Sequence, residues 1–213
     1  LYYLHALSEL GDIIFFMDNP VSKTEKAKLN SVPNLLYHAT RSHGEYDFGS
    51  YKRLYKWAIN KKIIKNYNWV YLVNDSVYGP FSSLKPVLEN MEASGADAIA
   101  MFKSIKKNQE FLQSWFIGLR KKIVLSDWFN KFINSVKKEK NKKDIVEKYE
   151  LGLSNLLIQN NVKTYSYFFD KKLHMTRNPL YFYRAGLPFL KKNSVLIPHS
   201  HIGEIKHILK SLP

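Results

Sequence analysis

Short apolar runs alternate with amphipathic stretches along the chain, and this pattern predicts an α/β domain. Apolar runs of strand length occur at residues 12–17, 69–73 and 96–102. The first of them is broken by Asp18-Asn19-Pro20, and amphipathic stretches lie between the runs. Strands that alternate with helices are typical of a sheet with helices on its faces. We therefore expect one mostly parallel sheet flanked by helices.

Apolar residues three and four positions apart predict the helices. Residues 48–59 form a clear case, because apolar side chains recur at helical spacing and Asp47 precedes them as an N-cap. Residues 144–159 form the longest predicted helix. Further helices are expected at 1–10, 84–91, 127–136 and 202–209, further strands at 35–39, 114–119 and 162–168, and an irregular tail from Arg177 up to the last helix.

Composition narrows the class of protein without choosing a function. The 213 residues include 33 Lys and Arg against 18 Asp and Glu, a formal net charge of +15. This length suits one domain with a sizeable core. A basic balance favours anionic partners, namely a phosphorylated substrate, an anionic membrane surface or nucleic acid. The absence of cysteine excludes disulfides and thiolate metal sites and agrees with a cytoplasmic location, and no apolar run approaches the roughly 18 residues of a membrane span.

Two glycines, Gly44 and Gly49, flank Asp47 where the chain enters the helix predicted at 48–59. Glycine lets the backbone approach a ligand closely, and a helix N-terminus offers free N–H groups to phosphate. This stretch is therefore a candidate site for a nucleotide. The alternative is a tight turn in which Asp47 only caps the helix.

The apolar run Trp69–Val73 ends in three polar residues, Asn74, Asp75 and Ser76. Ligands of open α/β sheets bind at the carboxyl ends of strands. A carboxylate there can hold Mg²⁺ or Mn²⁺ against a diphosphate, because hard cations prefer oxygen ligands. Asp75 is thus the candidate metal ligand and a divalent metal the candidate cofactor. The alternative is an Asx turn that merely ends the strand.

Glu150 is the candidate catalytic base. With residues placed at 100° steps, Ile145, Tyr149 and Leu153 belong to one apolar stripe, and Glu150 falls at its edge. A carboxylate at the border of a core is partly desolvated, which suits general-base chemistry. The alternative is a rim glutamate paired with one of the many lysines.

Two other features favour ordinary structural roles. The histidine pairs His38/His43 and His199/His201 have spacings too unspecific to predict a metal site. The lysine-rich run at 137–143 is typical of a solvated surface.

Four stretches of the chain form an ordered set of motifs. They are Gly44-Glu45-Tyr46-Asp47-Phe48-Gly49-Ser50-Tyr51-Lys52, Asn74-Asp75-Ser76-Val77-Tyr78-Gly79-Pro80, Leu112-Gln113-Ser114-Trp115-Phe116 and Tyr149-Glu150-Leu151-Gly152-Leu153. Taken together, they resemble the rhamnan synthesis protein F family of bacterial polysaccharide glycosyltransferases. Each stretch alone is a weak signal, but the ordered set is specific and covers about residues 1–190.

The resemblance implies a GT-A-like (Rossmann-like) fold over residues 1–213, in a fragment that lacks its first strand. It places Asp75 at the motif that binds the metal and the donor diphosphate, although the wider motif has two carboxylates and this one has a single acid. It places Glu150 at the catalytic base. The remaining implied contacts are Asn74 and Ser76 to the diphosphate, Gly44, Asp47 and Gly49 near the nucleotide, and Gln113, Ser114 and Trp115 to the acceptor.

The implied reaction is inverting transfer of a rhamnose-type sugar, dTDP-linked, to a lipid-linked saccharide of the cell surface. We expect a cytoplasmic enzyme on the inner face of the membrane, where each well-placed Lys or Arg adds about 1 kcal/mol of attraction to anionic lipid. One alternative is a basic nucleic-acid-binding module, but no nucleic-acid motif is present and no such partner is expected. The other is a non-catalytic saccharide-binding domain, which the single acid at Asp75 leaves open.

Overall fold

A computed structural model describes residues 1–106, 108–197 and 201–212 of the chain. Its strands are β1 (Ile13–Met17), β2 (Leu35–Thr40), β3 (Trp69–Val73), β4 (Val77–Tyr78), β5 (Ala98–Lys106), β6 (Gln109–Leu112), β7 (Phe116–Arg120), β8 (Thr164–Phe169) and β9 (Leu190–Lys191). Its α-helices are α1 (Tyr2–Ser8), α2 (Lys23–Lys28), α3 (Tyr46–Asn60), α4 (Lys85–Ala93), α5 (Lys121–Val124), α6 (Asp127–Ser135), α7 (Lys142–Ile145), α8 (Leu151–Gln159), α9 (Pro179–Arg184) and α10 (Ile202–Leu209).

The α/β class is confirmed, but the sheet is mixed where we expected it to be mostly parallel. The main sheet has the order β3-β7-β5-β6, with β8 on the other side of β5. β7 is antiparallel to both β3 and β5, and only β8 is parallel to its neighbour β5. The reason is that β5 is followed by β6 and β7 through short connections without a helix, and short connections join antiparallel strands.

The returning arm of this hairpin is interrupted at Gln113, Ser114 and Trp115. Leu112 lies opposite Lys103 and Ile117 lies opposite Ala100, so five steps on this arm span three steps on β5. Extra residues of this kind bend a strand and re-aim its side chains. The strand predicted at 114–119 therefore begins later, at Phe116, and the segment before it is free to build a site.

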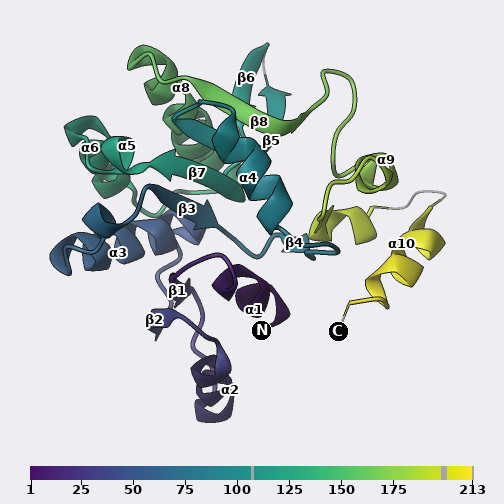
Figure 1. The fold of residues 1–213 in the computed structure, drawn as a ribbon, viewed down its shortest axis with the longest axis horizontal. Coiled ribbons are helices and arrows are strands. Elements are labelled where there is room, and N and C mark those ends of the chain that lie inside the picture. Colours follow the sequence, from purple (N-terminus) through teal and green to yellow (C-terminus); the bar gives the residue numbers. More distant parts are fainter. Residues whose placement is uncertain (107, 198–200, 213) are drawn as a thin grey trace.

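Two cores lie on the two faces of the main sheet. Ala98 and Ala100 pack toward α3, α6 and α8, whereas Ile99 and Met101 pack toward α1, α4 and α9 (Figure 1). This alternation is the two-residue period of a strand whose faces are both covered. The domain is thus a three-layer arrangement, helices on sheet on helices.

The helix predicted at 144–159 consists of three consecutive segments. Between α7 and α8 lies a π-helical turn, Val146–Glu150, whose last residue is the candidate base. Such turns are rare and occur often at functional sites. The tail after Arg177 also contains more structure than expected, because α9 and β9 precede the predicted closing helix, α10.

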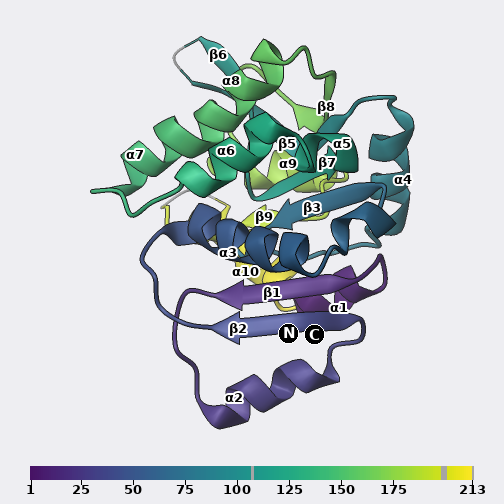
Figure 2. The same ribbon diagram turned by 90° about the vertical axis from the view of Figure 1, so that its left-hand side faces the viewer.

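Strands β1 and β2 form a separate parallel pair beside the main sheet. Figure 2 shows β3, β1 and β2 with their arrowheads at the same end, and α3 in front of the space between β3 and β1. A cavity of about 520 Å³ lies there, lined by residues of both strands, α1 and α3. The five apolar residues of β1 are consequently half-buried. The expected additional first strand stays a prediction.

Candidate functional site

The polar residues after β3 form the centre of the site. Asn74 donates its backbone N–H to the carbonyl of Trp115 (3.1 Å), and its side-chain oxygen accepts the N–H of Ser76 (3.0 Å). The second bond is an Asx turn, so the structural alternative is present, but Asn74 and not Asp75 makes it. The turn leaves the Asp75 side chain 90% exposed at the mouth of the site.

Asp47 meets this motif from the first turn of α3. Its carboxylate accepts a hydrogen bond from the Asn74 side-chain amide (2.8 Å). The prediction that Asp47 caps the helix is wrong, because the helix begins after Glu45, whose carbonyl accepts the Gly49 N–H (3.2 Å). Neighbouring protein atoms displace part of the water around the Asp47 carboxylate, which disfavours its charged form. This desolvation, together with the charges of Asp75 and Glu150, raises the pKa of Asp47 to about 6.

Glu150 reaches the same place from the π-helical turn. The hydroxyl of Ser114 donates a hydrogen bond to the Glu150 carboxylate, and the Ser114 carbonyl accepts the hydroxyl of Tyr51 (3.1 Å). Ser114 is 3% exposed, so these bonds fix Glu150 from below. Glu150 itself is half-buried, as its position at the edge of the apolar stripe predicts.

Two lysines that we did not predict complete the site. The ammonium of Lys191 donates to the Ser76 hydroxyl (3.0 Å) and lies 4.8 Å from the centre of the Trp115 ring. The ammonium of Lys192 lies 2.9 Å from a carboxylate oxygen of Asp75. Burial lowers the pKa of Lys191 to about 7, against the opposing charges of Glu150 and Asp47.

The residues predicted to contact an acceptor lie mainly under the site. The side-chain amide of Gln113 donates to the Ser104 hydroxyl (2.6 Å), and its oxygen accepts the indole N–H of Trp115 (2.8 Å). Trp115 is 2% exposed and supports Lys191 from beneath. A direct contact of Gln113, Ser114 or Trp115 with an acceptor stays a prediction.

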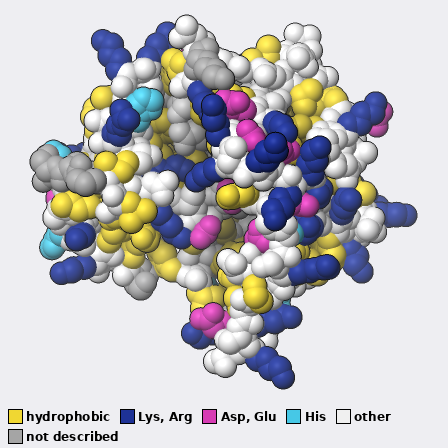
Figure 3. Space-filling view, turned by 180° about the vertical axis from the view of Figure 1, so that it is seen from behind, with side chains coloured by type: hydrophobic (Ala, Val, Ile, Leu, Met, Phe, Trp, Pro, Cys, Tyr) yellow, Lys and Arg dark blue, Asp and Glu magenta, His cyan; other side chains and the backbone are white. Residues whose placement is uncertain are grey.

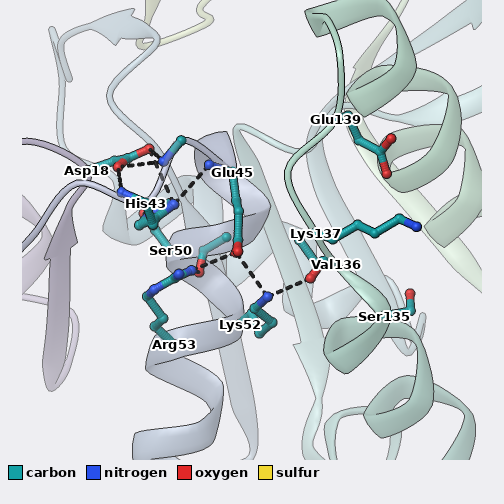
Figure 4. A network of polar contacts seen from close by, with 12 residues as sticks. Asp18, His43, Glu45, Ser50, Lys52, Arg53, Ser135, Val136, Lys137 and Glu139 are labelled. Atoms are coloured by element: carbon teal, nitrogen blue, oxygen red, sulfur yellow. Dashed lines mark hydrogen bonds and ion pairs between the residues drawn. The ribbon is translucent and has the colours of Figure 1, made fainter.

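The loop before α3 is held by Asp18 at the end of β1 (Figure 4). The carboxylate of Asp18 accepts the backbone N–H groups of His43 (2.5 Å) and Gly44 (3.1 Å). The His43 ring accepts the N–H of Glu45 (3.0 Å) and lies 3.1 Å from the Ser50 hydroxyl. The ring of His43 therefore orders the loop and has no free nitrogen for a metal. His199 of the other pair lies outside the described residues.

The opposite side of this network is an ion cluster around Glu45 (Figure 4). Its carboxylate lies 2.7 Å from the Arg53 guanidinium and 2.9 Å from the Lys52 ammonium. The hydrogen bond from Arg53 is the main cause that lowers the pKa of Glu45 to about 2. Lys52 also donates to the carbonyl of Val136 (2.5 Å), which ties α3 to the segment after α6.

The two predicted glycines have different roles. Gly44 has a φ of +66° and lies beside the Lys138 side chain at the edge of the site, so a close backbone approach to a ligand is open there. Gly49 is buried inside α3, and a Cβ at this position would overlap Glu45 and lie 2.7 Å from the His43 ring. Gly49 is therefore required for packing of the loop.

Asp47, Asn74, Asp75 and Lys192 line a cleft of about 1350 Å³ between the end of β3, β1 and the start of α3. This exceeds the roughly 300–1000 Å³ of typical small-molecule pockets. Charged and polar residues that line it include Asp18, Asn19, Glu25, Lys28, His43, Asp47, Asn74, Asp75, Lys138 and Lys192.

The described residues do not fit a divalent ion held by the protein alone. Within the described part of the chain, no group of three or more His, Asp or Glu side chains is arranged to hold a metal. The exposed carboxylate of Asp75 is paired with Lys192. The metal proposed at Asp75 stays an untested prediction.

Fold and site together define an α/β domain with a polar cleft at the carboxyl end of a sheet strand, where such domains bind their ligands. The family model described as rhamnan synthesis protein F matches residues 13–209, most of the chain. The chain therefore belongs to the rhamnan synthesis protein F family, as the four stretches predicted. Membership ties it to rhamnan synthesis and thus to polysaccharide biosynthesis.

Other comparisons add little. No curated protein matches the chain significantly. A solved structure described as "Crystal Structure of A197 from STIV" is similar over 73% of this chain and 81% of that one, at 10% identity and a TM-score of 0.36; a likeness this distant carries no argument. In the described part of the chain, no helix has the length and apolarity required to cross a bilayer.

Proposed function

We propose that this chain is a glycosyltransferase, GT-A-like in plan, that moves a sugar from a nucleotide-sugar donor onto a growing rhamnan. The observation that carries the proposal is that residues from four stretches of the sequence meet at one site. Asp47, Asn74-Asp75-Ser76, Ser114 and Glu150 come from four separate stretches of the sequence. Hydrogen bonds and mutual charge effects join them at one end of β3. A cluster of carboxylates whose charges act on one another, one of them with a raised pKa, is typical of a catalytic site.

The chemistry that we assign to the site is transfer of the sugar with inversion at the anomeric carbon. Glu150 takes the proton of an acceptor hydroxyl, and the acceptor oxygen forms a bond to the anomeric carbon. The bond from that carbon to the diphosphate oxygen breaks, and its electron pair leaves with the nucleoside diphosphate. The Ser114 hydroxyl orients the Glu150 carboxylate. Positively charged groups at the site stabilise the negative charge that develops on the nucleoside diphosphate as it leaves.

Membership of the family supports a proposal for the donor and the acceptor. Rhamnan synthesis requires an activated rhamnose-type sugar, for which we propose a dTDP-linked donor in the cleft. We propose a lipid-linked saccharide as the acceptor, on the cytoplasmic face of the membrane. The net charge of +15 would attract the domain to anionic lipid there.

The test is transfer of labelled rhamnose to a lipid-linked acceptor by the wild-type chain and by Glu150→Gln. We expect the variant to fold, with an unchanged circular dichroism spectrum and nucleotide affinity, and to lose transfer by about 100-fold or more. Glu110→Gln, which changes an exposed glutamate on β6 paired with Lys103, is the matched control and should transfer normally.

Full activity of Glu150→Gln would refute the assignment of Glu150 as the base. Nucleotide-sugar binding by the wild-type chain, without transfer to any acceptor, would instead support the non-catalytic saccharide-binding alternative.

A further inference from the structure

The contacts of the Lys191 ammonium leave it able to bind an anion. Its ammonium contacts a neutral hydroxyl, Ser76, and the face of the Trp115 ring. Within the described part of the chain, no carboxylate lies within salt-bridge distance of it, because the acids whose charges it feels, Glu150 and Asp47, act from farther away. A desolvated ammonium with such incomplete partners favours an incoming anion.

Lys192 is a cation whose present partner is easily exchanged. Its ion pair with Asp75 joins a lysine that is 40% exposed to an aspartate that is 90% exposed. Exposed pairs of this kind contribute little to stability, since water screens both charges. The lysine lines the large cleft, so it can turn from Asp75 to a ligand without losing a strong interaction.

The backbone sets both lysines at the candidate donor motif. β9 pairs with β4, so that Val77 lies opposite Lys191, and the Lys192 N–H donates to the Ser76 carbonyl (3.0 Å). The two side chains consequently flank the turn Asn74-Asp75-Ser76. Lys138 lines the same cleft, and the charge of Lys142 acts on both Asp47 and Lys191. Several cations therefore lie close enough to act on the acids Asp47, Asp75 and Glu150 around this turn.

We propose that Lys191 and Lys192, and not a metal held by the protein, bind the diphosphate of the donor and neutralise the leaving group. This proposal rests on the proposed transferase function and assigns the electrostatic part of it. Lys191 would bind the phosphate from a fixed position above Trp115. Lys192 would exchange Asp75 for a phosphate oxygen.

The experiment is isothermal titration of the wild-type chain with dTDP-rhamnose and with dTDP, UDP and GDP, in EDTA and again with Mn²⁺. We expect binding in EDTA, and less than about a threefold change in affinity with Mn²⁺. Lys191→Met should weaken binding by about tenfold or more and Lys192→Met by a smaller factor. Lys56→Met, at an exposed position of α3 about two and a half turns beyond Asp47, should bind like the wild type.

A second readout separates a direct role of Lys191 from a structural one. Because the pKa of Lys191 is about 7, the side chain is mostly neutral at pH 8 and must take up a proton when it binds an anion. The binding enthalpy at pH 8 should therefore vary with the ionisation enthalpy of the buffer, and this variation should shrink in Lys191→Met.

The outcomes distinguish the role of the two lysines from the transferase function on which it rests. Binding that requires Mn²⁺, or equal affinity of Lys191→Met and the wild type, would overturn the lysine proposal and leave the transferase function standing. No binding of dTDP, UDP or GDP compounds, with or without metal, would overturn both.

Discussion

Asp47 is a carboxylate kept where ionisation is unfavourable. The protein around the cleft and the charges of Asp75 and Glu150 raise its pKa to about 6, from a usual value near 4. The folded state thus binds the proton of Asp47 more tightly than the unfolded chain. A cost of this kind is typical of groups retained for function.

This shift predicts a pH-dependent effect of Asp47→Asn. With the folded pKa above the unfolded one, the contribution of Asp47 to stability falls as pH rises from about 4 to about 6 and stays low above that. Relative to the wild type, Asp47→Asn should therefore gain stability across this range and hold the gain at pH 8. Urea unfolding at pH 4, 5, 6 and 8 measures it, with Asp127→Asn in the first turn of α6 as the control. A difference that is the same at every pH would contradict the assignment.

At the residue scale the sequence located the acids and missed the lysines. Asp75 follows an apolar strand and Glu150 borders an apolar stripe, so periodicity marks both positions. Lys191 and Lys192 lie 115 and 117 residues from their partners Ser76 and Asp75. They reach the site through β4 and β9, two residues each. A pairing this short leaves no periodic signal in the sequence.

At the scale of elements, the half-buried position of Glu150 was predicted correctly, although the helix that carries it is not a uniform α-helix. The 100° wheel assumes a uniform α-helix over residues 144–159. The turn Val146–Glu150 departs from that geometry, yet Glu150 still lies half-buried against Ser114. The prediction survived because Tyr149, within the turn, and Leu153, after it, both remain core residues.

The two helical glycines give a prediction at the same scale. Gly49→Ala should destabilise the protein by about 1–3 kcal/mol, because its Cβ would overlap Glu45 and the His43 ring. Gly152→Ala is the matched control. Its Cβ would make an ordinary contact, 3.7 Å from Phe132. Because alanine favours a helix over glycine by about 0.5–1 kcal/mol, this variant should not lose stability.

Chemical denaturation of the two variants measures this difference. Equal stability of Gly49→Ala and the wild type would show that the loop around His43 yields easily, and would remove the packing role assigned to Gly49.

The strands show what the sequence alone could not decide. Apolar runs marked β1, β3 and β5, but they carry no information on direction or neighbours. The antiparallel β7 arises because the chain turns back directly after β5, and the interruption at Gln113-Ser114-Trp115 has no hydrophobic period to reveal it. The strand and helix order was therefore predictable, whereas the pairing was not.

At the scale of the whole molecule, basic side chains outnumber acidic ones. On the face in Figure 3, Lys and Arg side chains lie over much of the surface and are interspersed with acidic ones. A net charge of +15 distributed in this way suits general attraction to an anionic surface. The site itself is more specific, since the lysines there face named partners at the end of β3.

The central claim, that this member of the rhamnan synthesis protein F family binds a nucleotide sugar at the end of β3, is tested most directly by a thermal-shift screen. Wild type and Lys191→Met are heated with dTDP-, UDP- and GDP-linked sugars, each in EDTA and with Mn²⁺. Because a ligand that binds only the folded state raises Tm, at least one nucleotide sugar should raise the wild-type Tm by several degrees and raise that of Lys191→Met less. No shift of the wild type with any nucleotide sugar, in either condition, would contradict the account.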